Sequence, residues 1–143
     1  RRVGADVTVN VEEEDLGSVV DDVTGGTGAD LVVDVVPHTA ETLCDAVEIA
    51  KPMGTIVIAG TKGHAVTGLD PDVITRKALT IKGVQKLSSS YDLAFDLMAS
   101  TRVPLETLST HLLGLEEVET AIDILAGRVP GERAICVSVE PRP

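Results

Sequence analysis

Three glycines stand close together in the stretch "VTGGTGADLVVDVV", which runs from Val23 to Val36. A glycine-rich loop that binds a nucleotide phosphate follows a strand and opens a helix, because free amide groups and the positive dipole end lie at a helix N-terminus. Gly25, Gly26 and Gly28 instead follow a helical pattern and precede an apolar run, where carbonyl groups would repel a phosphate. We interpret them as a helix C-cap and turn, and the chain has no GxGxxG motif.

Histidines and cysteines are the residues that could hold a metal ion. His38, His64 and His111 share no ligand spacing, and Cys44 and Cys136 lie far apart with no CxxC motif and no cysteine-histidine cluster. We therefore expect neither a zinc site made by this chain nor a disulfide framework. Both cysteines are interpreted as buried small apolar residues.

One acidic residue, Asp34, interrupts the apolar run "LVVDVV". An ionised carboxylate in a buried strand must be paired or open to a cleft. Asp34 could act as a buried catalytic acid, but we favour a structural or cleft-lining role.

These side chains need elements to position them, and the chain alternates strand-like runs with helical patterns. The predicted strands are Asp6–Val11, Leu31–Val36, Thr55–Gly60, Lys77–Val84, Leu108–Leu113 and Ala134–Val139. The predicted helices are Leu16–Val23, Thr39–Ala50, a short helix begun by Asp70 and Pro71, a helix capped within Ser88–Ser90 that reaches about Ser100, and Glu116–Ala126. This order predicts an α/β fold with a doubly wound, mainly parallel sheet, whose ligands bind at the carboxyl ends of the strands.

Length and composition limit the remaining possibilities. With 143 residues, 43% of them apolar, the chain is expected to form one domain with one core, burying roughly 70% of its unfolded surface. A formal net charge of −11 would repel nucleic acid and anionic membranes. No apolar stretch approaches the roughly 18 residues of a membrane span, so we expect a soluble, cytoplasmic protein. Because the chain starts at Arg1, we expect its natural N-terminus upstream, and a missing targeting signal proves little.

Six stretches in order resemble the C-terminal half of the medium-chain dehydrogenases/reductases, the zinc-type alcohol dehydrogenase superfamily. They are "GADVTVNV", "TGGTGADLVVDVV", "KPMGTIVIAG", "RKALTIKGV", "LSTHLLGLEEVETAIDIL" and "GERAICVSV". The resemblance implies that residues 1–87 are the C-terminal part of a Rossmann-type nucleotide-binding domain, truncated at its N-terminus. Residues 88–143 would be closing helices and strands that return toward an absent catalytic domain. It further implies NAD or NADP as cofactor, zinc held by the intact enzyme and not by this chain, no catalytic residue here, and no activity of a lone copy.

The resemblance also implies cofactor contacts at the ends of the predicted strands. Val35, Val36 and His38 would hold the adenosine ribose and nicotinamide, mostly through backbone and van der Waals contacts. Pro37 departs from the glycine of many relatives and removes an N–H group, so contact at this turn would differ. The alternative for both valines is plain sheet core.

Two further turns carry the other implied contacts. Ala59, Gly60 and Thr61 would pass beside the nicotinamide, where small residues permit close approach. Val84 and Lys86 would bond the carboxamide through main-chain atoms, although Lys86 fits a solvated loop lysine equally well.

Arg133 lies where the resemblance implies a basic residue that reaches the cofactor pyrophosphate, since a guanidinium binds two phosphate oxygens at once. The alternative is a surface arginine before an edge strand.

The stretch His64–Asp70 falls where family members pair a short strand across a two-fold axis, which implies a homodimer. The other partner implied is an alcohol or carbonyl substrate of the intact enzyme.

Three other functions stay open at this stage. One is the zinc-free quinone or enoyl reductase branch of the same superfamily. Another is a methyltransferase, which should end in an antiparallel hairpin that the pattern does not favour. The last is a non-catalytic dimerising scaffold module.

Overall fold

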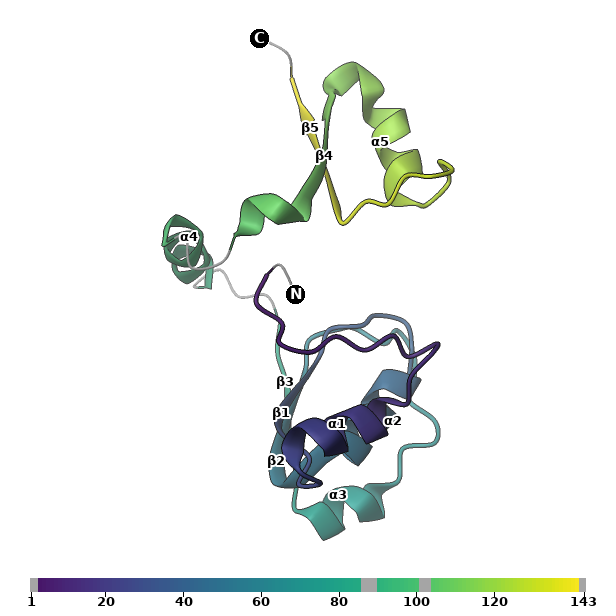
Figure 1. The fold of residues 1–143 in the computed structure, drawn as a ribbon, viewed down its shortest axis with the longest axis vertical. Helices are drawn as coiled ribbons and strands as arrows, with labels where there is room; N and C mark the ends of the chain where they lie inside the picture. Colours follow the sequence, from purple (N-terminus) through teal and green to yellow (C-terminus); the bar gives the residue numbers. More distant parts are fainter. Residues whose placement is uncertain (1–2, 86–89, 101–103, 142–143) are drawn as a thin grey trace. The chain divides into compact units, whose positions relative to one another are not determined.

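The computed structural model describes residues 3–85, 90–100 and 104–141. The chain divides into two compact units, residues 9–87 and residues 1–8 together with 88–143 (Figure 1). The expectation of one domain with a single core is therefore wrong, because each unit has its own parallel strands and its own helices.

The unit of residues 9–87 is a three-stranded parallel sheet with helices. Its elements are α1 (Leu16–Thr24), β1 (Ala29–Asp34), α2 (Glu41–Ile49), β2 (Ala50–Ile58), α3 (Pro71–Lys77) and β3 (Thr80–Gly83). The strand order is β1-β2-β3, and Val33, Val57 and Lys82 lie opposite one another across the sheet. Parallel strands end at the same edge, so the segments that follow β1, β2 and β3 come together there.

The glycines after α1 end that helix, as predicted. Gly25 is its C-cap with φ 63°, and its N–H donates to the carbonyl of Asp21. Gly28 has φ 82°, and a Cβ on it would lie 2.8 Å from the carbonyl oxygen of Ile49. A residue with a side chain would be strained at Gly28 and would also collide with the backbone of Ile49 and Lys51, at the end of α2 and the start of β2.

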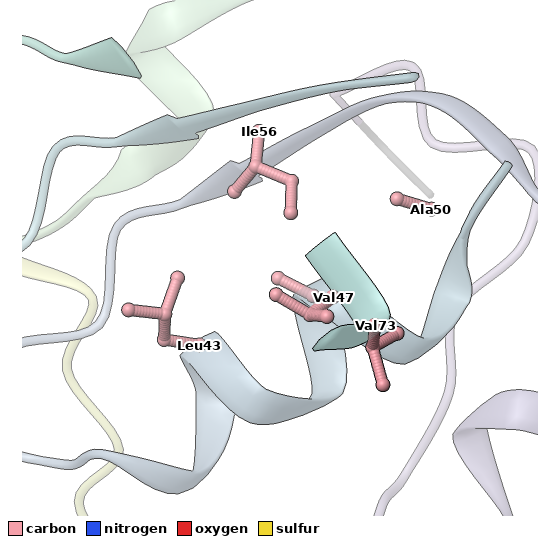
Figure 2. Packing of buried hydrophobic residues seen from close by; sticks show 6 residues of the cluster. Leu43, Val47, Ala50, Ile56 and Val73 are labelled. Carbon is pink, nitrogen blue, oxygen red and sulfur yellow. The ribbon is translucent and has the colours of Figure 1, made fainter. Parts of the chain in front are cut away.

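The larger core lies between α2, α3 and β2 (Figure 2). It consists of Leu43, Ala46, Val47, Ala50, Ile56 and Val73. Ile56, in the central strand, is the most deeply buried of these, with none of its surface exposed. This packing makes the central strand the firmest support for the segments at its carboxyl end.

The strand predicted over Asp6–Val11 is absent from the structure. Val7 and Val11 are 45% and 67% exposed. An alternating pattern becomes a strand only where a neighbouring strand accepts its hydrogen bonds, and no described strand pairs with this segment.

The second unit is built on a parallel two-stranded sheet. Its elements are α4 (Tyr91–Ala99), a 3-10 turn η2 (Leu105–Leu108), β4 (Ser109–Gly114), a 3-10 turn η3 (Leu115–Glu117), α5 (Val118–Leu125) and β5 (Cys136–Glu140). β4 pairs with β5 in parallel, with α5 crossing between them in sequence. A parallel pair is not the antiparallel hairpin expected of a methyltransferase.

The prediction that both cysteines are buried is wrong. Cys44 is half-buried on α2, and Cys136 is exposed at the start of β5. Cys136 is exposed because β5 has a strand on one side only and begins at a loop.

The predicted fold class, α/β with mainly parallel strands, is confirmed. Among the described helices, none has the length and apolar character needed to cross a membrane.

Candidate functional site

Backbone hydrogen bonds bring the segments that follow β1, β2 and β3 together. The amides of Ala59 and Gly60 both donate to the carbonyl of Asp34, at 2.8 and 3.0 Å. The amide of His38 donates to the carbonyl of Thr61 at 3.1 Å, and that of Val84 to Ile58 at 3.0 Å. The sequence-predicted residues 35, 36, 38, 59–61 and 84 thus lie at one edge of one sheet.

Gly60 lies against the turn that follows β1. A Cβ at this position would be 2.5 Å from the carbonyl oxygen of Val36 and 2.7 Å from the carbonyl carbon of Val35. A glycine is required here because the two turns touch through their backbones. The backbone of Val35 and Val36 occupies the space where a side chain would lie. From the sequence, we expected the small residue to permit close approach of a cofactor ring.

Val35 and Val36 directly follow β1, and their side chains are exposed. They are 64% and 41% exposed, so neither belongs to the core. Beside them lies a cavity of about 210 Å³. Its apolar lining includes Val11, Leu16, Val32, Val35, Val36 and Ile49. A ring system fits a cavity of this size, which is smaller than the roughly 300–1,000 Å³ of a pocket for a whole drug-sized ligand.

Asp34 is buried and paired, as expected of a charge inside an apolar strand. Its carboxylate lies 2.7 Å from the ammonium of Lys62, and their side chains are 2% and 8% exposed. The carboxylate also accepts from the hydroxyl of Thr42 at 3.2 Å and from the amide of Val36 at 3.1 Å. These contacts support the structural role over that of a catalytic acid.

Sequence reasoning missed Lys62. Its ammonium donates to the carbonyl of Val36 at 2.7 Å and to the hydroxyl of Thr42 at 2.9 Å, besides its pairing with Asp34. A single lysine after a strand usually extends into solvent. The one available signal was the unpaired carboxylate of Asp34, which required a cation from elsewhere in the chain.

Val36 offers no free amide donor to a ligand, because its N–H donates to Asp34, and its C=O already accepts from Lys62. The amides of Ala59, Gly60, His38 and Val84 are occupied likewise. A ring bound at this edge would meet van der Waals contacts from the valines and no amide donor from these five residues.

The remaining predicted residues differ in exposure and location. His38 is exposed and has a left-handed backbone with φ 60°, and Val84 is 52% exposed. Lys86 lies outside the described residues. Arg133 belongs to the second unit, where it is exposed in the segment before β5.

Two carboxyl groups near the surface have lowered pKa values. A hydrogen bond from the hydroxyl of Thr39 lowers the pKa of Glu41, in the first turn of α2. The ammonium of Lys51 lowers the pKa of Asp30 through a hydrogen bond on the surface of β1. Over the described ranges, no three His, Cys, Asp or Glu residues come together where a metal ion could bind.

Parallel strands with turns gathered at their carboxyl ends are typical of Rossmann-type α/β domains. The sequence model of the zinc-binding dehydrogenases matches residues 1–100, and the chain belongs to this family.

Three known proteins illustrate the similarity. A probable alcohol dehydrogenase of Mycobacterium tuberculosis is 35% identical over 131 residues, which cover 90% of this chain and 35% of that protein. The crystallised alcohol dehydrogenase of Thermus sp. ATN1 superposes with a TM-score of 0.81 at 27% identity, over 94% of this chain and 38% of its own. A protein of Sinorhizobium meliloti is described as a zinc-binding dehydrogenase and was solved with NADP bound. It superposes with a TM-score of 0.79 at 26% identity, over 97% of this chain and 40% of its own. This chain thus spans little more than a third of each of them.

Proposed function

We propose that this chain is the C-terminal part of an NAD(P)-dependent oxidoreductase and binds the nicotinamide cofactor at the carboxyl ends of β1, β2 and β3. The enzyme would transfer a hydride between the cofactor and an alcohol or carbonyl substrate. The observation that carries the proposal is the convergence of residues 35–38, 59–61 and 84 at one sheet edge, in a chain of the zinc-binding dehydrogenase family.

The residues present fit one part of such a cofactor. The exposed side chains of Val35 and Val36 beside an apolar cavity offer contact to a planar ring and exclude water from it. Arg133 is proposed to bind the pyrophosphate through its exposed guanidinium. When bound, the nicotinamide supplies or accepts the hydride.

Zinc would belong to the remainder of the intact enzyme, where it polarises the substrate oxygen. Within the described residues this chain brings no metal-ligand cluster together, so no zinc ligand is assigned to it. We therefore propose that a lone copy is catalytically inactive although it contributes to cofactor binding.

Calorimetric titration of the chain with NADH and with NADPH tests the proposal. Saturable binding of one of them is expected, and Val36→Asp should weaken it about tenfold, since a carboxylate would be desolvated against the ring. Val118→Asp is the matched control, because Val118 is 43% exposed, close to the 41% of Val36, and begins α5. Absence of binding, or equal weakening by both variants, would contradict the proposed site.

We also propose that the segment His64–Asp70 pairs with its copy across a two-fold axis. This segment forms no strand within the chain, and its residues are exposed except for Val66 and Leu69, which pack against the core. Sedimentation equilibrium should give a dimer for the chain and a monomer for Thr67→Pro, since proline removes a backbone donor and resists sheet pairing. A monomeric unaltered chain would refute the dimer.

A further inference from the structure

The ammonium of Lys62 has three partners inside the protein. It donates hydrogen bonds to the carbonyl of Val36 at 2.7 Å and to the hydroxyl of Thr42 at 2.9 Å, and it forms an ion pair with the carboxylate of Asp34 at 2.7 Å. At 8% exposure it has little contact with water. Lys62 is therefore held inside the protein by three contacts.

The partners of Lys62 are equally committed. The hydroxyl of Thr42 accepts from Lys62, so its own proton goes to the carboxylate of Asp34. The carboxylate also accepts the amide proton of Val36. The side chains of Asp34, Thr42 and Lys62 thus bond one another and the backbone of Val36, which points to holding the chain in place as their role.

The structure the network holds is the turn after β1. Val36 is fixed from both sides, by Asp34 at its N–H and by Lys62 at its C=O, with Gly60 pressed against its backbone. His38 is tied to Thr61 in addition. The direction of the exposed valine side chains at this edge therefore depends on a lysine that does not itself reach the surface.

We propose that Lys62 is a positioning residue, which acts with Asp34 and Thr42 to hold Val35 and Val36 in the geometry that receives the cofactor ring. The proposal rests on the proposed cofactor site. It explains why a buried ion pair occupies a place that two apolar side chains could fill with equal stability. Apolar residues could not bind the N–H and C=O groups of Val36.

The decisive variant replaces both members of the pair, as Asp34→Val with Lys62→Met. Removing Lys62 alone would leave a carboxylate buried without its cation, whereas removing both leaves no uncompensated charge and is expected to keep the fold. Lys82→Met is the matched control, because it removes a lysine from the exposed strand β3.

Two readouts separate positioning from stability. In the double variant, the amide of Val36 should exchange with deuterium about tenfold faster than in the unaltered chain, with the amide of Ile56 as the internal reference. NADH should bind about tenfold more weakly. The midpoint of urea unfolding should not change. Lys82→Met should change none of the three. A double variant with unchanged exchange at Val36, or with unchanged affinity, would overturn the proposal.

The test still gives an answer if the double variant does not fold or if the unaltered chain binds no cofactor. If the double variant does not fold, Thr42→Val keeps the ion pair but frees one donor of Lys62, and faster exchange at Val36 is again expected; unchanged exchange refutes the positioning role. If the unaltered chain binds neither NADH nor NADPH, the proposed function fails. Exchange at Val36 then still decides whether Lys62 holds the turn.

Discussion

Residues 9–87 enclose six buried apolar side chains between helices and a three-stranded sheet, whereas the described part of the second unit buries only Ala121 and Ile124. Its helix α4 has no buried residue at all. The buried ion pair of Asp34 and Lys62 lies in the better packed unit. A desolvated charge pair needs rigid surroundings to keep its geometry, so the packing of the first unit is what permits a polar network beneath the candidate site.

The largest loss of stability is expected from a substitution of Asp34, whose charge is buried in the better packed unit. Asp34→Ala should lower the free energy of unfolding by about 3–5 kcal/mol, because Lys62 would be left buried without a counter-ion. The matched control is Asp30→Ala in the same strand, whose partner Lys51 lies on the surface. Urea unfolding should show little change for Asp30→Ala, and equal losses for the two variants would contradict the difference between buried and exposed pairs.

The two cores should differ in their tolerance of a cavity. Ile56→Ala should cost about 4 kcal/mol and Ile124→Ala about 2 kcal/mol, since the smaller core has fewer neighbours and relaxes more easily around the cavity. Ile56 is 0% exposed and Ile124 is 7% exposed. Chemical unfolding of both variants measures the two losses of free energy. A larger loss for Ile124→Ala than for Ile56→Ala would contradict the expected difference between the units.

The helix caps provide a smaller test. Asp70 caps α3 by accepting from the amide of Asp72 at 2.9 Å, while Ser90, before α4, makes no side-chain cap bond to the described residues. Asp70→Ala should therefore cost about 1 kcal/mol and Ser90→Ala less than about 0.5 kcal/mol in unfolding experiments. A cost at Ser90 that matched the cost at Asp70 would show that the cap geometry is not what matters.

The smallest effect is a pH dependence at α1. The amide of Ser18 donates to the side chain of Asp15 and lowers the pKa of that carboxyl. The folded state thus favours the ionised form, and its contribution is present above the unfolded pKa and is lost as pH falls through the folded pKa. The protection of the Ser18 amide, which is the intrinsic exchange rate divided by the observed rate at the same pH, should fall on acidification, and Asp15→Asn should abolish that fall; an unchanged pH response of the protection in Asp15→Asn would exclude the carboxylate as its source.

Local sequence signals predicted most of the elements because they are set by nearby residues. Gly25 supplied the left-handed cap of α1, and Asp70 with Pro71 began α3. The strand predicted from Thr55 begins earlier in the structure, since β2 starts at Ala50, directly after α2. Met53 adopts φ 63° within that strand, and the pairing register with β1 shifts nearby. Pro52 and Gly54 thus lie within an irregularity of the ladder, between the pairs Ala29–Ala50 and Leu31–Thr55.

The candidate site was predictable only in part. That the residues after β1, β2 and β3 meet follows from parallel strands, so Val36, Gly60 and Val84 could be placed together in advance. The role of Lys62 could not, because it depends on a contact with Asp34 across many positions of sequence and on the burial of both. The gap at Gly60 that admits the backbone of Val36 is likewise a tertiary property.

Residue-resolved chemical shifts during a titration with NADH or NADPH test the central claim most directly, because the same three strands provide site and control. The account predicts that the amides of Val36, Gly60 and Val84, at the carboxyl ends, shift with a common saturation curve. Those of Ala29, Ala50 and Thr80, at the amino ends of β1, β2 and β3, should stay in place. Shifts confined to the amino ends, or absent from both ends, would contradict a cofactor site at the carboxyl ends of β1, β2 and β3.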